Sequence, residues 1–242
     1  MNFKKIYKHI NRGLVLAVVL LITTICYVII GNLNFKKETD TIKGVVNNYA
    51  KESVTLSLLP DGANKVGATL TKEQAEKQIK AFDDILSKYW VGAEQSAFGN
   101  GGANVQFLKK DFENSIKSMI GKPSKSEIKS VDIKIGELKN VSRDGEKGAN
   151  VSFTFDVDVK SIGQPSVFIM VHHNNHLKGQ PGMDITISQN ESIVAAPDKD
   201  TEEKIDMTEK TTRISGGGVA KLHKSKGKWK IWEIGNFYTS NH

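Results

Sequence analysis

Cysteine is almost absent from this chain, which contains one, Cys26, in 242 residues. Small domains secreted from animal cells usually carry paired cysteines, so their absence after Cys26 excludes a disulfide framework for most of the chain. The same absence excludes a cysteine nucleophile in that part.

Arginine is nearly as scarce, with three residues against 31 lysines, so bidentate recognition of phosphate by guanidinium groups is not a theme of the sequence. The formal net charge is +7, and the first twelve residues supply four of these charges. The small remaining excess lacks the basic stripe with interleaved aromatic residues that single-strand binders use. We therefore expect no direct contact with nucleic acid.

Motifs of common hydrolases are absent as well. The chain has no Gly-x-Ser-x-Gly sequence and no His-Glu-x-x-His sequence. Many active sites have no local signature, so these absences lower the expectation of an enzyme without excluding one. We predict a protein that is not an enzyme, with no catalytic residue, no cofactor and no bound metal.

Against these absences stands one long apolar run. Residues 14–30 are interrupted only by Thr23 and Thr24, and a glycine lies at each end. As a helix the run would be roughly 26 Å long, close to the ~30 Å hydrocarbon core of a bilayer. Threonine is tolerated there because its hydroxyl bonds back to a carbonyl of its own helix. We predict a single transmembrane helix over residues 13–31.

The charges beside this run predict its orientation. The tail over residues 1–12 carries four lysine or arginine residues and no acid, whereas two lysines on the far side are followed at once by two acids. Under the positive-inside rule the tail is cytoplasmic and the C-terminal part is extracytoplasmic. The tail either lies on the anionic inner leaflet or is disordered. The expected location is therefore the cell membrane, with lipids contacted through the anchor.

Two other interpretations of the N-terminus compete with an uncleaved anchor. A cleaved signal peptide has a shorter apolar region and ends in small residues, but this run ends in bulky residues at 27–30. A lipoprotein signal needs a small residue directly before the lipidated cysteine, and here Ile25 precedes Cys26. The uncleaved anchor is the prediction retained.

Helical patterns follow the span. Residues 32–37 are expected to be a linker, and residues 38–59 contain an apolar stripe at helical spacing that a Pro-Asp-Gly sequence ends. Thr71 and Gln74 match a capping box, and the apolar residues after them recur at steps of four and three. A third helix is predicted over residues 108–120, after a glycine-rich irregular stretch.

From residue 131 onward the apolar period changes from about 3.6 to about 2. Residues 131–135 and 151–159 alternate apolar with polar side chains, which predicts two strands separated by a turn at residues 143–148. Residues 167–171 and 183–187 carry weaker strand patterns. This half of the chain is therefore expected to form a sheet.

The C-terminal end has the pattern of a hairpin. Residues 219–223 and 229–234 flank a Lys-Ser-Lys-Gly turn. Strict alternation places Trp229 and Trp232 on opposite faces of the last strand, with Glu233 on the face of Trp229. One tryptophan is therefore expected to pack against the helices.

Helices first and an antiparallel sheet afterwards predict an α+β fold. With its closing sequence GKWKIWEI at residues 227–234, the domain over residues 38–242 resembles the nuclear-transport-factor-two-like and cystatin-like cone folds. The resemblance implies helices packed on a curved antiparallel sheet, after the N-terminal transmembrane helix. A basic tail, one span and such a domain together resemble the bitopic scaffold subunits of type IV secretion and conjugation machines, which implies partners in an envelope complex.

His172, His173 and His176 are the most conspicuous candidate metal ligands. On a strand, His172 and His176 share one face, but zinc usually takes three or four protein ligands. Asp184 could act as a further ligand only if the chain folds back to bring it near the two histidines. The alternative is a polar turn between strands, which the neighbouring asparagines and Gly179 favour. The polar turn is the interpretation adopted, and no metal site is predicted.

Two further groups have both a structural and a functional interpretation. Gly216, Gly217 and Gly218 precede a strand and lack the lysine of a phosphate loop, so a bulge or a close backbone approach is expected. Asp83 and Asp84 are adjacent on one helix and point in different directions. Solvated side chains are therefore favoured over an acid–base pair.

Acidic and aromatic side chains of the sheet are the last candidates. Asp156 and Asp158 lie on the polar face of a strand and Glu146 lies in a turn, so they either line a cleft or are solvated. Trp90 and the two hairpin tryptophans are more typical of core aromatics than of a ligand cage. None of these residues is predicted to form a site.

Composition and organisation together suggest a bacterial envelope protein, more typical of a Gram-positive cell because lysine and asparagine are abundant and cysteine is absent outside the span. We expect a single-pass scaffold or docking subunit, most specifically of a conjugative type IV secretion apparatus. Two alternatives stay open: an extracytoplasmic domain that binds a small ligand or acts as an enzyme in the cone cavity, and an envelope sensor. A homo-oligomer is also left open.

Overall fold

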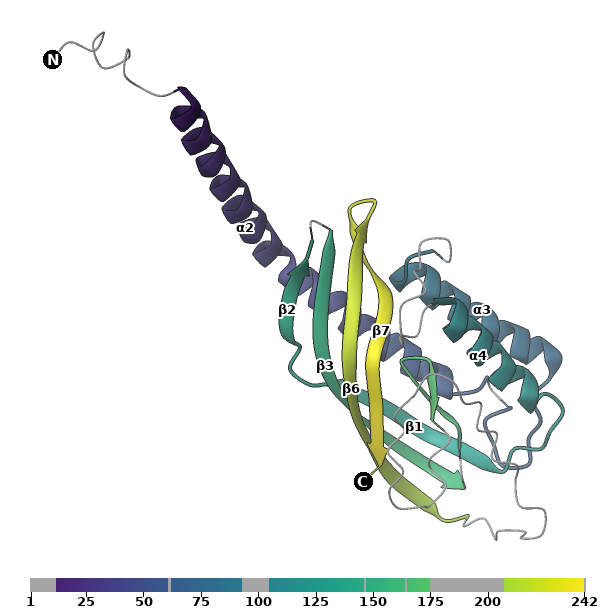
Figure 1. The fold of residues 1–242 in the computed structure, drawn as a ribbon. Helices are drawn as coiled ribbons and strands as arrows, with labels where there is room; N and C mark the ends of the chain where they lie inside the picture. The colour runs from purple at the N-terminus through teal and green to yellow at the C-terminus, as the bar shows by residue number, and fades with distance from the viewer. Residues whose placement is uncertain are drawn as a thin grey trace, which may run out of the picture. The chain divides into compact units, whose positions relative to one another are not determined.

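A computed structural model describes residues 12–60, 62–92, 105–145, 147–163, 165–174 and 207–241 of the chain. By its internal contacts the chain divides into two units, Met1–Asp40 and Thr41–His242. The first unit contains the apolar run. The second contains the α+β domain (Figure 1).

Helix α2 (Arg12–Val54) is continuous and is followed by the one-turn 3₁₀ helix η1 (Thr55–Ser57). Residues 32–37, expected to be a linker, are helical and lie within α2. The physical reason is the lack of a breaker: after Gly31 the helix meets only Gly44 before Pro60, and one glycine costs about 1 kcal/mol relative to alanine.

Helices α3 (Lys72–Tyr89) and α4 (Val105–Met119) form where the sequence predicts them. The capping box at the start of α3 is confirmed: the backbone N–H of Gln74 donates to Thr71 Oγ1 at 3.2 Å, and the N–H of Thr71 donates to Gln74 Oε1 at 3.0 Å. Two otherwise unpaired donors of the first turn are thereby satisfied. The irregular stretch expected before α4 lies largely outside the described residues.

The main sheet is antiparallel and has five strands in the described part of the chain, in the order β1-β3-β6-β7 with β2 also paired to β3. The strands are β1 (Ser126–Ile135), β2 (Lys139–Asp144), β3 (Gly148–Gly163), β6 (Glu209–Ser225) and β7 (Lys228–Asn241). Figure 1 shows the long strands β3, β6 and β7 running side by side. The α+β class is thus confirmed.

Strand β2 was not expected. Its residues were assigned partly to a turn at 143–148, but the structure places only the connection around Gly145 between β2 and β3. In β2 Val141 and Arg143 are half-buried and their neighbours exposed, so the strand lacks the apolar alternation that reveals β3.

One face of β3 forms the centre of the core. Val151, Phe153, Phe155, Val157 and Val159 are each at most 3% exposed, while the residues between them are partly or fully exposed. The period-2 pattern of the sequence therefore identifies the buried face correctly.

Aromatic side chains from the helices complete this core. The ring of Phe112 on α4 lies 4.5 Å from that of Phe82 on α3 and 4.9 Å from that of Phe168. Tyr49 on α2 meets Trp90 edge to face at 5.8 Å. Contacts of this geometry stabilise beyond their buried area. The last turns of α2 are therefore part of the domain core.

Two of the three glycines of β6 make room for phenylalanine rings of β3. Gly216 is paired with Phe155 and Gly218 with Phe153 on the neighbouring strand. A Cβ atom at Gly216 would lie 2.5 Å from Phe155 Cζ, and one at Gly218 would lie 3.0 Å from Phe153 Cζ. The pairing of β6 with β7 also shifts register between Gly217 and Val219, which forms a bulge there. The expected bulge is therefore present, and the backbone also approaches closely: a Cβ atom at Gly217 would lie 2.7 Å from the carbonyl oxygen of Phe153.

The predicted β6–β7 hairpin is present, and Lys226 and Gly227 both have positive φ as a two-residue turn requires. Strict alternation on β7 is wrong, however. Lys221 pairs with Glu233, and Leu222 pairs with Ile231. Trp232 therefore has no partner on β6 and forms a bulge. Glu233 therefore lies on the opposite face of the sheet from Ile231, and a bulge is invisible to a period-2 pattern.

A small second sheet contains β4 (Val167–Ile169) and β5 (His172–Asn174). Their connection, Met170 and Val171, is fully buried and has positive φ at both residues. Such a conformation is strained for a β-branched residue and persists only where the surroundings hold it. The strand expected at residues 183–187 lies outside the described residues.

Candidate membrane span and docking pocket

The apolar part of α2 is long and apolar enough to cross a membrane, and none of that stretch is buried. Its large apolar side chains, from Leu14 to Leu33, are between 46% and 65% exposed. Thr23 donates to the carbonyl of Val19, and Thr24 donates to that of Leu20 at 2.8 Å. Each hydroxyl is thus satisfied within the helix, which a hydrocarbon environment demands.

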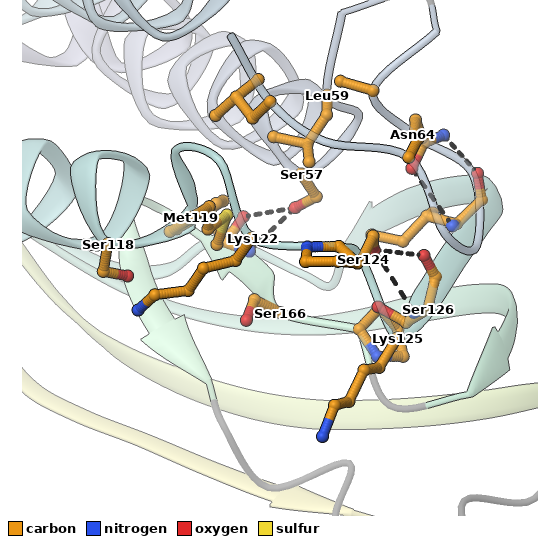
Figure 2. Close-up of a pocket in the computed structure, with 17 residues that line it drawn as sticks. Ser57, Leu59, Asn64, Ser118, Met119, Lys122, Ser124, Lys125, Ser126 and Ser166 are labelled. Carbon is orange, nitrogen blue, oxygen red and sulfur yellow. Dashed lines mark hydrogen bonds between the residues drawn. The ribbon is translucent and has the colours of Figure 1, made fainter. Parts of the chain in front are cut away.

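A pocket of about 450 Å³ lies in the domain, away from the span in sequence. Its wall is assembled from the segment after α2, the turn after α4, the start of β1 and the residues before β4 (Figure 2). Pockets of 300–1,000 Å³ are typical of binding sites. We refer to it as the docking pocket; its lining includes Ser57, Leu59, Ala63, Asn64, Leu70, Ser118, Met119, Lys122, Ser124, Lys125, Ser126, Ile128, Ser166 and Phe168.

Local hydrogen bonds fix the walls of the docking pocket. Ser57 Oγ accepts from the N–H of Phe168 at 2.8 Å, and Asn64 Nδ2 donates to the carbonyl of Ile128 at 2.7 Å. Ser124 Oγ donates to the carbonyl of Ser126 at 2.7 Å. Segments distant in sequence are thereby held together, so the pocket is formed before any ligand arrives.

The floor of the docking pocket is apolar. Leu70, Ile128 and Phe168 line it and are 3%, 4% and 1% exposed, with Ala63 beside them. Its rim is basic: Lys122 and Lys125 follow α4 on the same turn and are exposed, and Figure 2 shows both among the residues that line the pocket. The combination of an apolar floor and a cationic rim is the main chemical character of this site.

Polar candidates from the sequence do not converge on the docking pocket. Asp83 pairs with Lys109 at 3.0 Å and so links α3 to α4, while Asp84 is exposed. Asp156 accepts a hydrogen bond from Ser215 at 2.6 Å on the exposed face of the sheet. The described positions of these carboxylates agree with the solvated interpretation.

Asp158 lies on the same exposed face. Arg213 donates to it from Nε at 2.7 Å and from Nη2 at 3.1 Å, and Lys134 adds a contact at 3.4 Å. The hydrogen bonds from Arg213 hold the pKa of Asp158 below its usual range. This is a cross-strand ion pair that stabilises the sheet surface weakly.

The histidine cluster is only partly described. His172 and His173 belong to β5, which pairs with β4, whereas His176, Gly179 and Asp184 lie outside the described residues, as does Glu146. Among the residues that the structure describes, no group of three His, Cys, Asp or Glu side chains is placed to hold a metal ion.

Two of the three tryptophans are buried in the core, and the third is partly buried. Trp90 is 2% exposed and Trp229 is 7% exposed, while Trp232 is only partly buried. The backbone N–H of Val91 donates to the carbonyl of Ile231 at 2.9 Å, which fixes the end of α3 against β7. These residues hold the helices on the sheet.

A second polar cluster joins α2 to α3. Tyr89 Oη and Lys88 Nζ both donate to Glu52 Oε1 at 2.6 Å. Partial burial acts to raise the pKa of Glu52, but the hydrogen bonds from Lys88 and Tyr89 outweigh it and the pKa lies below its ordinary value. The cluster is thus a polar contact between α2 and α3.

Sequence reasoning missed the docking pocket. Its residues come from separate segments, and only the two lysines beside Pro123 gave a local signal, as a short basic turn. Nothing in the linear pattern places that turn against Leu70 and Ser166.

Comparison with known proteins identifies no relative: no family model, no curated protein and no solved structure matches the chain. What the protein does must therefore be inferred from its own residues and geometry.

Proposed function

We propose that this protein is a single-pass, membrane-anchored scaffold or docking subunit of a bacterial envelope assembly, most specifically a conjugative type IV secretion apparatus. The observation that carries the proposal is the exposed apolar stretch of α2 in a chain whose other unit is a packed α+β domain. An anchored domain acts on partners that share its membrane, and such confinement raises their effective concentration. Weak contacts between domains then suffice for assembly.

The orientation follows from charge. The four positive charges of residues 1–12 keep the tail in the cytoplasm, and the α+β domain lies outside the membrane in this proposal. The protein is placed in the cell membrane of a Gram-positive cell, where lipids surround the span. Partners are then extracytoplasmic or membrane-embedded proteins of the same complex, with self-association as a further arrangement.

The architecture supports this assignment. In the described chain three α-helices and the short helix η1 precede a sheet that ends in the β6–β7 hairpin, which is the element order of the cone folds named above. We assign the domain to that arrangement, with the helices packed on a curved antiparallel sheet. In this role the folded domain presents surfaces, and none of its carboxylates acts chemically.

The decisive experiment is deletion followed by complementation in the native host. Deletion is expected to abolish transfer of the conjugative element, and the wild-type chain is expected to restore it. A chain whose span is replaced by an unrelated span of the same orientation should also restore transfer, because anchoring is the role assigned to it. Unchanged transfer after deletion would contradict the proposal.

The rival function is an enzyme or small-ligand receptor, and the docking pocket is the observation that favours it. Single substitutions distinguish the two. Replacing Asp83, Asp84, His172 or His176 should leave transfer largely intact if the domain is a scaffold. A single polar substitution that stops transfer, while the protein stays folded and still assembles, would favour the rival.

A further inference from the structure

We propose that the docking pocket binds an extended acidic peptide segment of a partner protein, which inserts one apolar side chain into the pocket floor. The inference rests on the proposed scaffold function and names the chemistry of the partner. The shared recognition elements are one buried apolar contact and carboxylates at the rim.

Charge at the rim favours an acidic partner. Lys122 and Lys125 are the charged residues of the pocket lining, which contains no aspartate or glutamate. Both lysines are exposed, and within the described chain neither ammonium group has a carboxylate partner. An approaching carboxylate therefore meets two free cations without displacing an internal ion pair.

The hydrogen-bonding capacity of the walls is largely used. The side chain of Ser57 both donates to and accepts from the backbone of Phe168. The side chain of Asn64 does the same with the backbone of Ile128. Ser118 donates to the carbonyl of Ser115 at 2.7 Å. The groups left to bind a ligand are consequently the two lysines of the rim and the hydroxyls of Ser126 and Ser166.

The apolar floor distinguishes a peptide from a bare anion. A phosphate or acetate ion at Lys122 and Lys125 would leave the half-buried side chains of Leu59 and Met119, which also line the pocket, in contact with water. An apolar side chain covers them, and the removal of that surface from water supplies the non-directional part of the affinity. A peptide with carboxylates on both sides of one leucine satisfies the floor and the rim together.

The first experiment uses peptide display against the full-length protein in phosphatidylcholine nanodiscs. Selected peptides are expected to be enriched in Asp or Glu flanking one large apolar residue. The enrichment should disappear with Lys122→Glu/Lys125→Glu. It should persist with Lys72→Glu/Lys80→Glu, which makes the same charge change at exposed lysines of α3 outside the pocket. Enrichment without acidic residues, or enrichment that survives the pocket reversal, contradicts the proposal.

The second experiment uses a defined probe, an acetylated and amidated peptide with a central leucine between two aspartates on each side. Reversal of the pocket lysines should weaken its binding by about tenfold or more, and the control reversal should leave it within about twofold. Replacing the leucine by serine should also cost about tenfold. If the serine peptide binds equally well and inorganic phosphate displaces both, the pocket is an anion site and the peptide proposal is wrong.

A covalent block tests the location without altering charge. In a Cys26→Ser background, Ser166→Cys provides a single thiol at the rim, because Cys26 is the only native cysteine. Modification with a bulky maleimide should abolish binding of the leucine peptide, whereas the unmodified variant should bind it. Undiminished binding after complete modification overturns the assignment.

The two proposals fail separately. If the acidic peptides do not bind but deletion still abolishes transfer, the scaffold function stands and its contact lies on another surface. If deletion leaves transfer unchanged, the scaffold function fails whatever the peptides do.

Discussion

Tyr49 donates its phenolic hydroxyl to the main-chain carbonyl of Met170 at 3.0 Å, which ties α2 to the buried turn between β4 and β5. Burial raises the pKa of Tyr49 far above its ordinary value, so the hydroxyl remains a donor over the whole working pH range. The bond satisfies a carbonyl in a strained segment that has no access to water. A single side chain thus links the helix that continues from the span to the centre of the domain core.

Tyr49→Phe should lower the free energy of unfolding of the domain by about 1–3 kcal/mol, because it leaves the buried carbonyl of Met170 without its donor. Tyr238→Phe is the matched control: Tyr238 is 53% exposed, and its change should be close to neutral. Urea unfolding followed by tryptophan fluorescence measures both, since all three tryptophans lie in the second unit. Equal losses for the two variants would count against the link.

Gly216→Ala should destabilise the domain by about 1–3 kcal/mol, because the new Cβ overlaps the backbone carbonyl of Tyr238 and the ring of Phe155. Gly44→Ala is its control. Nothing lies within 4 Å of a Cβ at that helical position, so this change should stabilise by about 0.5–1 kcal/mol. Urea midpoints of the two variants should move in opposite directions; a neutral Gly216→Ala would mean that β6 and β3 separate easily.

Trp229→Ala should cost about 3–5 kcal/mol, because Trp229 is 7% exposed and packs in the core. Trp232 lies in the β7 bulge and is only partly buried, so Trp232→Ala should cost much less. Chemical unfolding followed by circular dichroism is the appropriate measurement, since both changes remove a fluorophore. Small and equal losses would show that β7 contributes little to the core.

Stability should fall in acid partly through Glu52. Its folded-state pKa lies below the ordinary value of a glutamate, so its contribution is present above that ordinary value and is lost as the pH falls through the folded pKa. Glu52→Gln should therefore flatten the pH dependence of the melting temperature below about pH 5, around and below the ordinary glutamate pKa. Tyr89→Phe removes one of the two hydrogen-bond donors to Glu52 and should flatten the pH dependence of the melting temperature in part. A slope unchanged by Glu52→Gln would exclude this cluster as a source of acid sensitivity.

Topology is measurable with protease added outside intact cells. The proposed orientation predicts digestion of the chain beyond about residue 35, which lies past the span over residues 13–31, and protection of the first twelve residues. Epitope tags at each end report the two outcomes. Loss of the N-terminal tag with survival of the C-terminal one would reverse the orientation.

The sequence predicted those elements whose signals are local. The capping residues Thr71 and Gln74, the alternating pattern of β3 and the turn at Lys226 and Gly227 each depend on neighbours in the chain, and each is confirmed. These residues need no distant partner to take up their conformations. Local propensity and tertiary packing therefore agree at these positions.

The elements that were missed depend on contacts between distant segments. Strand β2 exists because β3 offers it a partner, and the bulge at Trp232 follows from the register between β6 and β7. The docking pocket arises where Leu70 and Ser166 come together with the turn after α4. The linear pattern of residues does not specify which distant segments meet, so these features cannot be predicted from it.

The contact between Lys230 and Ser87 has a consequence for the order of events in biosynthesis. Lys230 Nζ donates to the carbonyl of Ser87, 143 positions earlier in the chain. The ribosome thus makes the helices long before the strand that closes the core over them. Pairing between such distant segments folds slowly, because the loop entropy is lost before the contact forms. The helices and the early strands of the nascent domain accordingly cannot complete their core until β7 leaves the ribosome.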